Sequence, residues 1–131
     1  METGYSSNSK SSELPLYKLV REFAVMFLKY AKNIPKYYRY ALVERVSDQL
    51  VETLSFFYLT AMTSNKVEKR QYLLLSRQQM AKVIIEVRLL HELGALGNKA
   101  FVLLAQKSDE IGKQLYLWNR KLADEKLKIE S

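Results

Sequence analysis

The stretch that decides the fold reads FVLLAQKSDEIGKQLYLWNRKL and spans residues 101–122. Alternating steps of three and four residues connect the members of one mainly apolar series: Phe101, Leu104, Ser108, Ile111, Leu115, Trp118 and Leu122. That spacing places the whole series on one face of an α-helix, whereas the residues on one face of a strand recur at every second position. The stretch therefore predicts a long amphipathic helix that packs through this face.

Three further segments, within residues 16–34, 43–61 and 73–90, show the same helical periodicity. Turn signals between the segments are few: Pro35, then Ser64 and Asn65, then the stretch from Gly94 to Asn98. Four amphipathic helices joined by short connections are typical of a bundle. The sequence therefore predicts an all-α protein that folds as an antiparallel, up-down-up-down four-helix bundle.

The 131 residues are enough for one domain. We expect a disordered, serine-rich N-terminal segment at residues 1–13, the bundle at residues 14–127, and a short tail at residues 128–131. Cysteine is absent, the N-terminus has no apolar signal region, and no long apolar run lacks charge. These features favour a cytoplasmic protein without a membrane segment.

The residues that most catalytic sites require are missing or isolated. The chain has one histidine, no cysteine and no glycine-rich phosphate loop, so neither a catalytic triad nor a clustered metal site can be assembled. We expect His91 to be hydrogen-bonded at an end of the bundle. The sequence thus predicts a noncatalytic protein that has no metal site and uses no cofactor.

The charge of the chain points to a polyanionic partner. Lysine and arginine number 21 against 14 acidic residues, which gives a net charge of +7. In an up-down bundle many of these cations gather at the two ends, where they are candidates for salt-dependent phosphate contacts. The candidates for nucleic-acid binding are Lys29, Lys32, Lys36, Arg39, Lys66, Lys69, Arg70, Lys99, Arg120 and Lys121. The alternative is a merely solvated basic surface.

Apolar residues also occur outside the four inward stripes. Helical phase, at about 100° per residue, places several of them on outer faces. The candidates for an oligomer interface are Tyr38, Phe56, Leu59, Ile85, Leu89, Val102 and Leu117. We favour self-association, because such residues lie on several helices. Scattered surface residues and docking of a partner protein are the alternatives.

The junction NIPKYYRYAL, residues 33–42, combines a proline, two cations and three tyrosines. Pro35 favours the first turn of a new helix. Helical phase makes Arg39 continue the inward stripe of that helix, so Lys36 and Arg39 can meet either phosphate or the carbonyls at a helix end. Tyr38 shares the phase of Phe56, which favours an interface role over base stacking.

Five stretches carry a family resemblance: LPLYK (14–18), NIPKYYRYALVERV (33–46), TSNKVEKR (63–70), EVRLLHELGAL (86–96) and DEIGKQLYLWNRK (109–121). In order and spacing they resemble the accessory variability determinant family of diversity-generating retroelements. That family belongs with the four-helix-bundle proteins encoded in intervening sequences of 23S ribosomal RNA genes. The resemblance covers about residues 14–122.

The resemblance implies a basic, barrel-like homopentamer that binds a reverse transcriptase and nucleic acid, above all template RNA and also DNA. It implies a noncatalytic role in mutagenic complementary-DNA synthesis, in which adenines are copied unfaithfully. Two sets of positions match the family pattern: Pro35, Lys36, Arg39 and Arg45 at the start of helix two, and Glu110, Ile111, Gly112 and Trp118 in helix four.

Two rival interpretations remain. One is a bundle protein from a 23S ribosomal intervening sequence, whose role is unknown and whose fold is the same. The other is a structural module for protein–protein interaction. A neighbouring reverse-transcriptase gene with paired repeats distinguishes the retroelement from the ribosomal setting.

Overall fold

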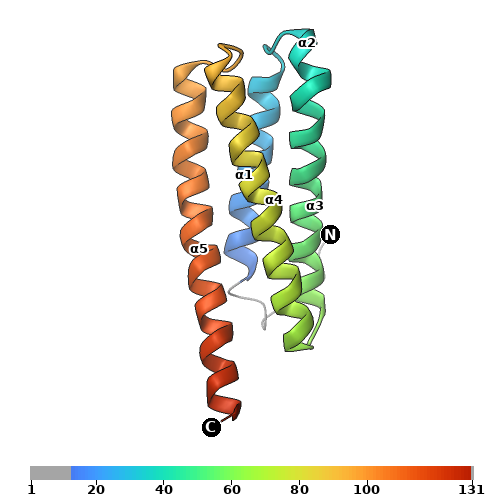
Figure 1. The fold of residues 1–131 in the computed structure, drawn as a ribbon, viewed down its shortest axis with the longest axis vertical. Helices are drawn as coiled ribbons and strands as arrows, with labels where there is room; N and C mark the ends of the chain where they lie inside the picture. Colours follow the sequence, from blue (N-terminus) through green and yellow to red (C-terminus); the bar gives the residue numbers. More distant parts are fainter. Residues whose placement is uncertain (1–12, 131) are drawn as a thin grey trace.

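The structure is a computed structural model that describes the backbone of residues 13–130 and the side chains of residues 15–124. Over that range the chain is helical and has no strand (Figure 1). The four helical rods are α1 (Glu13–Ala31), then α2 (Lys36–Tyr38), η1 (Arg39–Val43) and α3 (Glu44–Met62) as one rod, then α4 (Lys66–Glu92), then α5 (Asn98–Glu130). The predicted all-helical class is thus confirmed.

The rods pack as a ring in which each one contacts two neighbours. Helix α1 packs against α3 and α5, and α4 packs against the same two helices. Residues 32–35 and 93–97 connect helices at one end of the molecule, which we call the loop end, and residues 63–65 form the turn at the other end, the turn end (Figure 1). No helix among residues 13–130 is both long enough and apolar enough to cross a membrane.

Two boundaries differ from those predicted. Helix α5 continues to Glu130, past the tail expected from residue 128, because residues 120–130 contain no glycine or proline and are rich in lysine, leucine, alanine and glutamate. Helix α1 already includes Glu13, and the rest of the N-terminal segment predicted to be disordered lies outside the described residues.

The predicted apolar stripes form one shared core. On α5, Leu104, Ile111 and Leu115 are buried, and the Trp118 ring lies 6.3 Å from that of Phe57 on α3. Further buried core residues follow the stripes on α1, α3 and α4 or, for Ile34, lie just after α1: Leu16, Val20, Phe23, Phe27, Ile34, Val46, Leu50, Leu73, Met80, Val83, Val87 and Leu90. Each helix therefore turns its stripe inward.

Two of the predicted turn regions bound α4 as expected. The Asn65 side chain accepts hydrogen bonds from the backbone N–H groups of Val67, at 2.9 Å, and Glu68, at 3.1 Å, and so caps α4. At the other end of α4, Gly94 has φ = 77°, a left-handed conformation that glycine adopts without strain. This turn brings the chain back toward α5.

Helices α3 and α4 share the most extensive contact in the bundle. Small polar side chains on these helices, Thr53, Thr60 and Ser76, are fully buried. Each hydroxyl donates to the carbonyl four residues before it, at 2.7–2.8 Å, so none remains unsatisfied. Small residues let two helix backbones approach closely, which explains the extent of this contact.

We predict that Ser76→Leu destabilises the protein by about 1–3 kcal/mol, because a larger side chain must push α3 and α4 apart. Ser76→Ala is the matched control and should change the free energy of unfolding by less than about 1 kcal/mol, since its hydroxyl is satisfied within its own helix. Urea unfolding of both variants measures the difference. Equal stabilities would contradict the close-packing explanation.

The second rod begins with an irregular turn. Pro35 precedes α2, and the following residues of η1 form a π-helical turn in which Glu44 N–H donates to the carbonyl of Arg39. A π turn holds more residues than an α turn, so it changes the helical phase of everything before it. The predicted inward phase of Arg39 relative to α3 was therefore wrong.

Arg39 ties the junction to the end of α1. Its Nε donates to the carbonyl of Ile34 at 2.9 Å, and its terminal guanidinium nitrogen donates to the carbonyl of Lys32 at 2.6 Å. It is exposed rather than part of the inward stripe. Of the two roles left open for this cation, the contact with carbonyls after a helix end is the one observed.

We predict that Arg39→Ala lowers the free energy of unfolding by about 1–2 kcal/mol, because two charge-assisted hydrogen bonds disappear. Lys36→Ala, which removes an exposed cation three residues earlier, is the control and should cost less than about 0.5 kcal/mol. Chemical denaturation reports both. A loss of the same size in the two variants would mean that the Arg39 contacts do not stabilise the junction.

Candidate nucleic-acid interface

The loop end gathers five of the predicted basic residues. Lys29 lies in the last turn of α1, Lys32 follows that helix, Lys36 begins α2, Arg39 begins η1, and Lys99 is the second residue of α5. All five are exposed. Residues far apart in the sequence thus contribute cations to one end of the bundle, which we call the loop-end cluster.

The other five lie toward the turn end. Lys66, Lys69 and Arg70 belong to the first two turns of α4, and Lys69 is half-buried. Arg120 and Lys121 follow Trp118, whose ring meets that of Phe57 five residues before α3 ends, so they lie toward the same end. We call these five residues the turn-end cluster. Positive charge is therefore split between two ends of the molecule.

The predicted interface residues divide into two groups. Leu59, Ile85, Leu89, Val102 and Leu117 are exposed by 41–60%. Tyr38 and Phe56 are half-buried instead: Tyr38 packs against the core and meets Tyr37 edge to face at 5.2 Å, and Phe56 stacks on Tyr72 of α4 at 6.3 Å. These two rings contribute to the fold of a single copy as well as to its surface.

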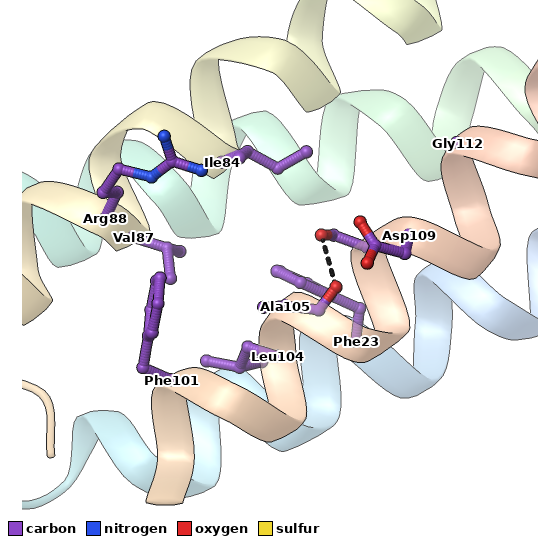
Figure 2. A pocket seen from close by; sticks show the side chains of 10 residues that line it. Phe23, Ile84, Val87, Arg88, Phe101, Leu104, Ala105, Asp109 and Gly112 are labelled. Atoms are coloured by element: carbon purple, nitrogen blue, oxygen red, sulfur yellow. Dashed lines mark hydrogen bonds between the residues drawn. The ribbon is translucent and has the colours of Figure 1, made fainter. Parts of the chain in front are cut away.

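A groove between α4 and α5 was not predicted from the sequence. Two hollows of about 320 and 210 Å³ share Ile84, Ser108 and Gly112, and so run into one another along the helices. We call this the α4–α5 groove. Figure 2 shows Phe101 and Ala105 of α5 on one side and Val87 of α4 on the other.

Charged side chains border this groove. Arg77 and Arg88 come from α4 and Asp109 from α5, and all three are exposed. Neither arginine forms a hydrogen bond or an ion pair with another described residue. The groove thus combines an apolar floor with two cations that have no counter-charge in the described part of the chain.

Gly112 lies where the two hollows meet, in the middle of α5. A Cβ added to it would have no atom within 4 Å, so nothing in this chain requires a glycine there. Glycine in a helix interior costs about 1 kcal/mol relative to alanine. The one sequence signal for this groove was therefore a glycine in the interior of a helix, next to the apolar stripe and away from any turn.

The outer side of the α3–α4 contact is polar. Gln79 donates to Glu52 at 2.6 Å, and Arg45 Nε lies 3.3 Å from the carboxylate of Glu86. The Glu86 side chain is only 8% exposed, and one of its oxygens has no partner. This carboxylate therefore links Arg45 and, through a 3.4 Å hydrogen bond, Gln49 of α3 to α4.

We predict that Arg45→Ala destabilises the protein by about 1–3 kcal/mol, because it leaves the buried Glu86 carboxylate without its cation. In a Glu86→Gln background the same arginine substitution should cost much less. A double-mutant cycle from urea unfolding measures this coupling. Additive effects would show that the two side chains do not interact energetically.

The remaining titratable contacts are also structural. His91 Nδ1 lies 3.0 Å from the Leu96 carbonyl, and its ring stacks on Phe101 at 4.2 Å, near the loop end as predicted. Lys107 of α5 donates to Glu22 of α1 at 3.1 Å, and this hydrogen bond holds the pKa of Glu22 below its usual value. No cluster of potential metal ligands occurs among the described residues.

Comparison with known proteins does not identify the chain. No protein-family model matches it, and no curated protein matches it significantly.

Proposed function

We propose that this chain is a noncatalytic accessory protein of a diversity-generating retroelement. The chain folds as an antiparallel, up-down-up-down bundle and self-associates; in the family that it resembles, the assembly is a pentamer. It binds the reverse transcriptase and the template RNA through its basic ends. In this role it supports mutagenic complementary-DNA synthesis. The reaction itself belongs to the reverse transcriptase, and the accessory protein acts in the cytoplasm.

One observation carries the nucleic-acid part of this proposal: the loop-end and turn-end clusters place exposed cations at both ends of a chain whose net charge is +7. Phosphate contacts made by such clusters position a nucleic acid without reading its sequence. The exposed Tyr37 and Tyr40 lie beside the loop-end cluster, where they can stack on unpaired bases.

The identity of the RNA and of the polymerase rests on the resemblance in the five sequence stretches. A bundle protein of a 23S ribosomal intervening sequence remains the alternative with the same fold. A structural interaction module is the other alternative, and the exposed apolar residues on α4 favour it: Val67, Leu74, Leu75, Ile85, Leu89.

We predict that Lys32→Glu, Lys36→Glu and Lys99→Glu together weaken binding of single-stranded RNA. The salt dependence is the slope of log K against log salt concentration. Each phosphate that the variant no longer neutralises should reduce the magnitude of this slope by about 0.7. Arg39 is left unchanged because it supports the junction. Fluorescence anisotropy over a range of salt concentrations, with two unrelated RNA sequences, gives the affinity and the slope. Both sequences should lose affinity equally.

The control for this variant reverses Arg21, Lys82 and Lys113, three exposed cations that lie away from the helix ends. It changes the net charge by the same amount, so it isolates charge position from total charge. If both variants lose the same affinity, RNA binding depends on net charge alone. If the wild-type protein does not bind RNA at low salt, the nucleic-acid role is refuted.

The polymerase role has a separate test. The wild-type protein should co-purify with the reverse transcriptase encoded beside it, in the presence of a nuclease as well as in its absence. Recovery that disappears with nuclease would mean that RNA alone joins the two. No recovery under either condition would refute the accessory role and favour the ribosomal or structural alternative.

A further inference from the structure

The outer face of α3 is the acidic part of a basic chain. Helix α3 carries three carboxylates and one arginine, whereas the neighbouring α4 carries an excess of cations. At about 100° per residue, six exposed residues share one side of α3. They are Glu44, Asp48, Val51, Ser55, Leu59 and Met62, and we call them the α3 outer face. It is apolar toward the turn end and acidic toward the loop end.

The α4–α5 groove has the complementary character. Its floor is apolar and includes Gly112, where an added Cβ would have no atom within 4 Å. Its α4 side carries Arg77 and Arg88. These arginines are eleven residues apart, or about 16 Å along the helix. The two carboxylates of the α3 outer face, Glu44 and Asp48, are four residues or about 6 Å apart, so together they can reach one of these arginines.

We propose that the α3 outer face of one copy docks into the α4–α5 groove of a second copy. Val51 and Ser55 then lie over Gly112, where the absence of a side chain lets two helix backbones approach closely. The acidic residues of α3 meet one of the two groove arginines, and the apolar residues cover the groove floor. This contact rests on the self-association in the proposed function and specifies the two faces that form it.

Charge selects a second copy over the other occupants. A nucleic acid would find two arginines but also a mostly apolar floor, which suits a helix better than a phosphate backbone. The helix required has carboxylates beside small and apolar residues on one face, and this chain itself exposes such a helix in α3. A helix from another protein is an outcome that the experiment below can detect.

The contact is head-to-tail, because different faces meet. In the ring of rods α3 sits between α1 and α4, diagonally across from α5, so its outer face and the groove lie on different sides of the molecule. Each docking step therefore turns in the same direction. Contacts of this kind produce a closed ring when the rotation closes and a helical filament when it does not.

The test reverses charge on one face at a time in the full-length protein. One variant carries Glu44→Lys and Asp48→Lys, and the other carries Arg77→Glu and Arg88→Glu. We expect the wild-type chain to form multimers at micromolar concentration and each variant alone to remain a single copy. Mixing the two variants should restore assemblies that contain both, since each reversed face then meets an opposite charge. Native mass spectrometry counts the copies of each variant.

Three results would overturn the proposal. The wild-type chain could remain a single copy, which would leave the groove to a different protein. Both variants could still assemble, which would place the interface elsewhere. Each variant alone could remain a single copy while the mixture also forms no assemblies that contain both variants. Lys36→Glu with Lys99→Glu, at the loop end, is a control of equal charge change to the groove variant and should assemble normally.

A substitution at Gly112 provides a second measurement. A Cβ at residue 112 meets no atom within 4 Å and leucine favours the helix, so the melting temperature of a single copy should not fall. It fills the groove, so the association constant should fall at least tenfold. Gln114→Leu adds the same side chain two positions later, on another side of α5, and should leave assembly unchanged. Equal assembly of the two leucine variants would overturn the docking mode.

Failure of the docking and failure of the proposed function are distinguishable. If the charge-swap pair assembles but the wild-type chain binds no RNA, the interface stands and the nucleic-acid role falls. If the wild-type chain remains a single copy but still binds RNA in a salt-dependent way, the docking is refuted and the nucleic-acid role stands.

Discussion

Burial of one apolar stripe from each helix is the constraint on which the rest of the molecule depends. Once Phe27, Leu50, Leu90 and Leu104 share a core, the rotation of every helix about its axis is fixed. The residues that remain outside are then fixed as well. The acidic face of α3, the arginines of α4 and the glycine of α5 are consequences of the same burial, although none of them contributes to the core.

The helices themselves could be predicted because their signal is periodic and local. The stripe from Leu104 to Leu122 and the cap at Asn65 needed no information from other parts of the chain. The π turn at Arg39–Val43 could not be predicted, since no residue type marks an extra residue in a helical turn. The inward phase predicted for Arg39 was counted through this turn and was therefore displaced.

The candidate site was predictable only in outline. Helix order was enough to place Lys32, Lys36 and Lys99 at one end, because charges at helix termini depend on topology alone. The carbonyl contacts of Arg39 and the groove beside Gly112 depend on how two helices meet in space. The residue pattern of one helix contains no information on how it packs against another helix. The single glycine in α5 was therefore the only sequence signal for the groove.

Gly112 also bears on how this protein would respond to engineering. A search for heat-resistant variants of the single chain would favour replacing this residue early, because a residue with a Cβ helps the helix and that Cβ meets no atom within 4 Å. Such a search measures only the isolated bundle. In the docking proposed above, Gly112 is where the backbone of a second copy comes close, so thermal tolerance and the capacity for that docking are opposing objectives at this position.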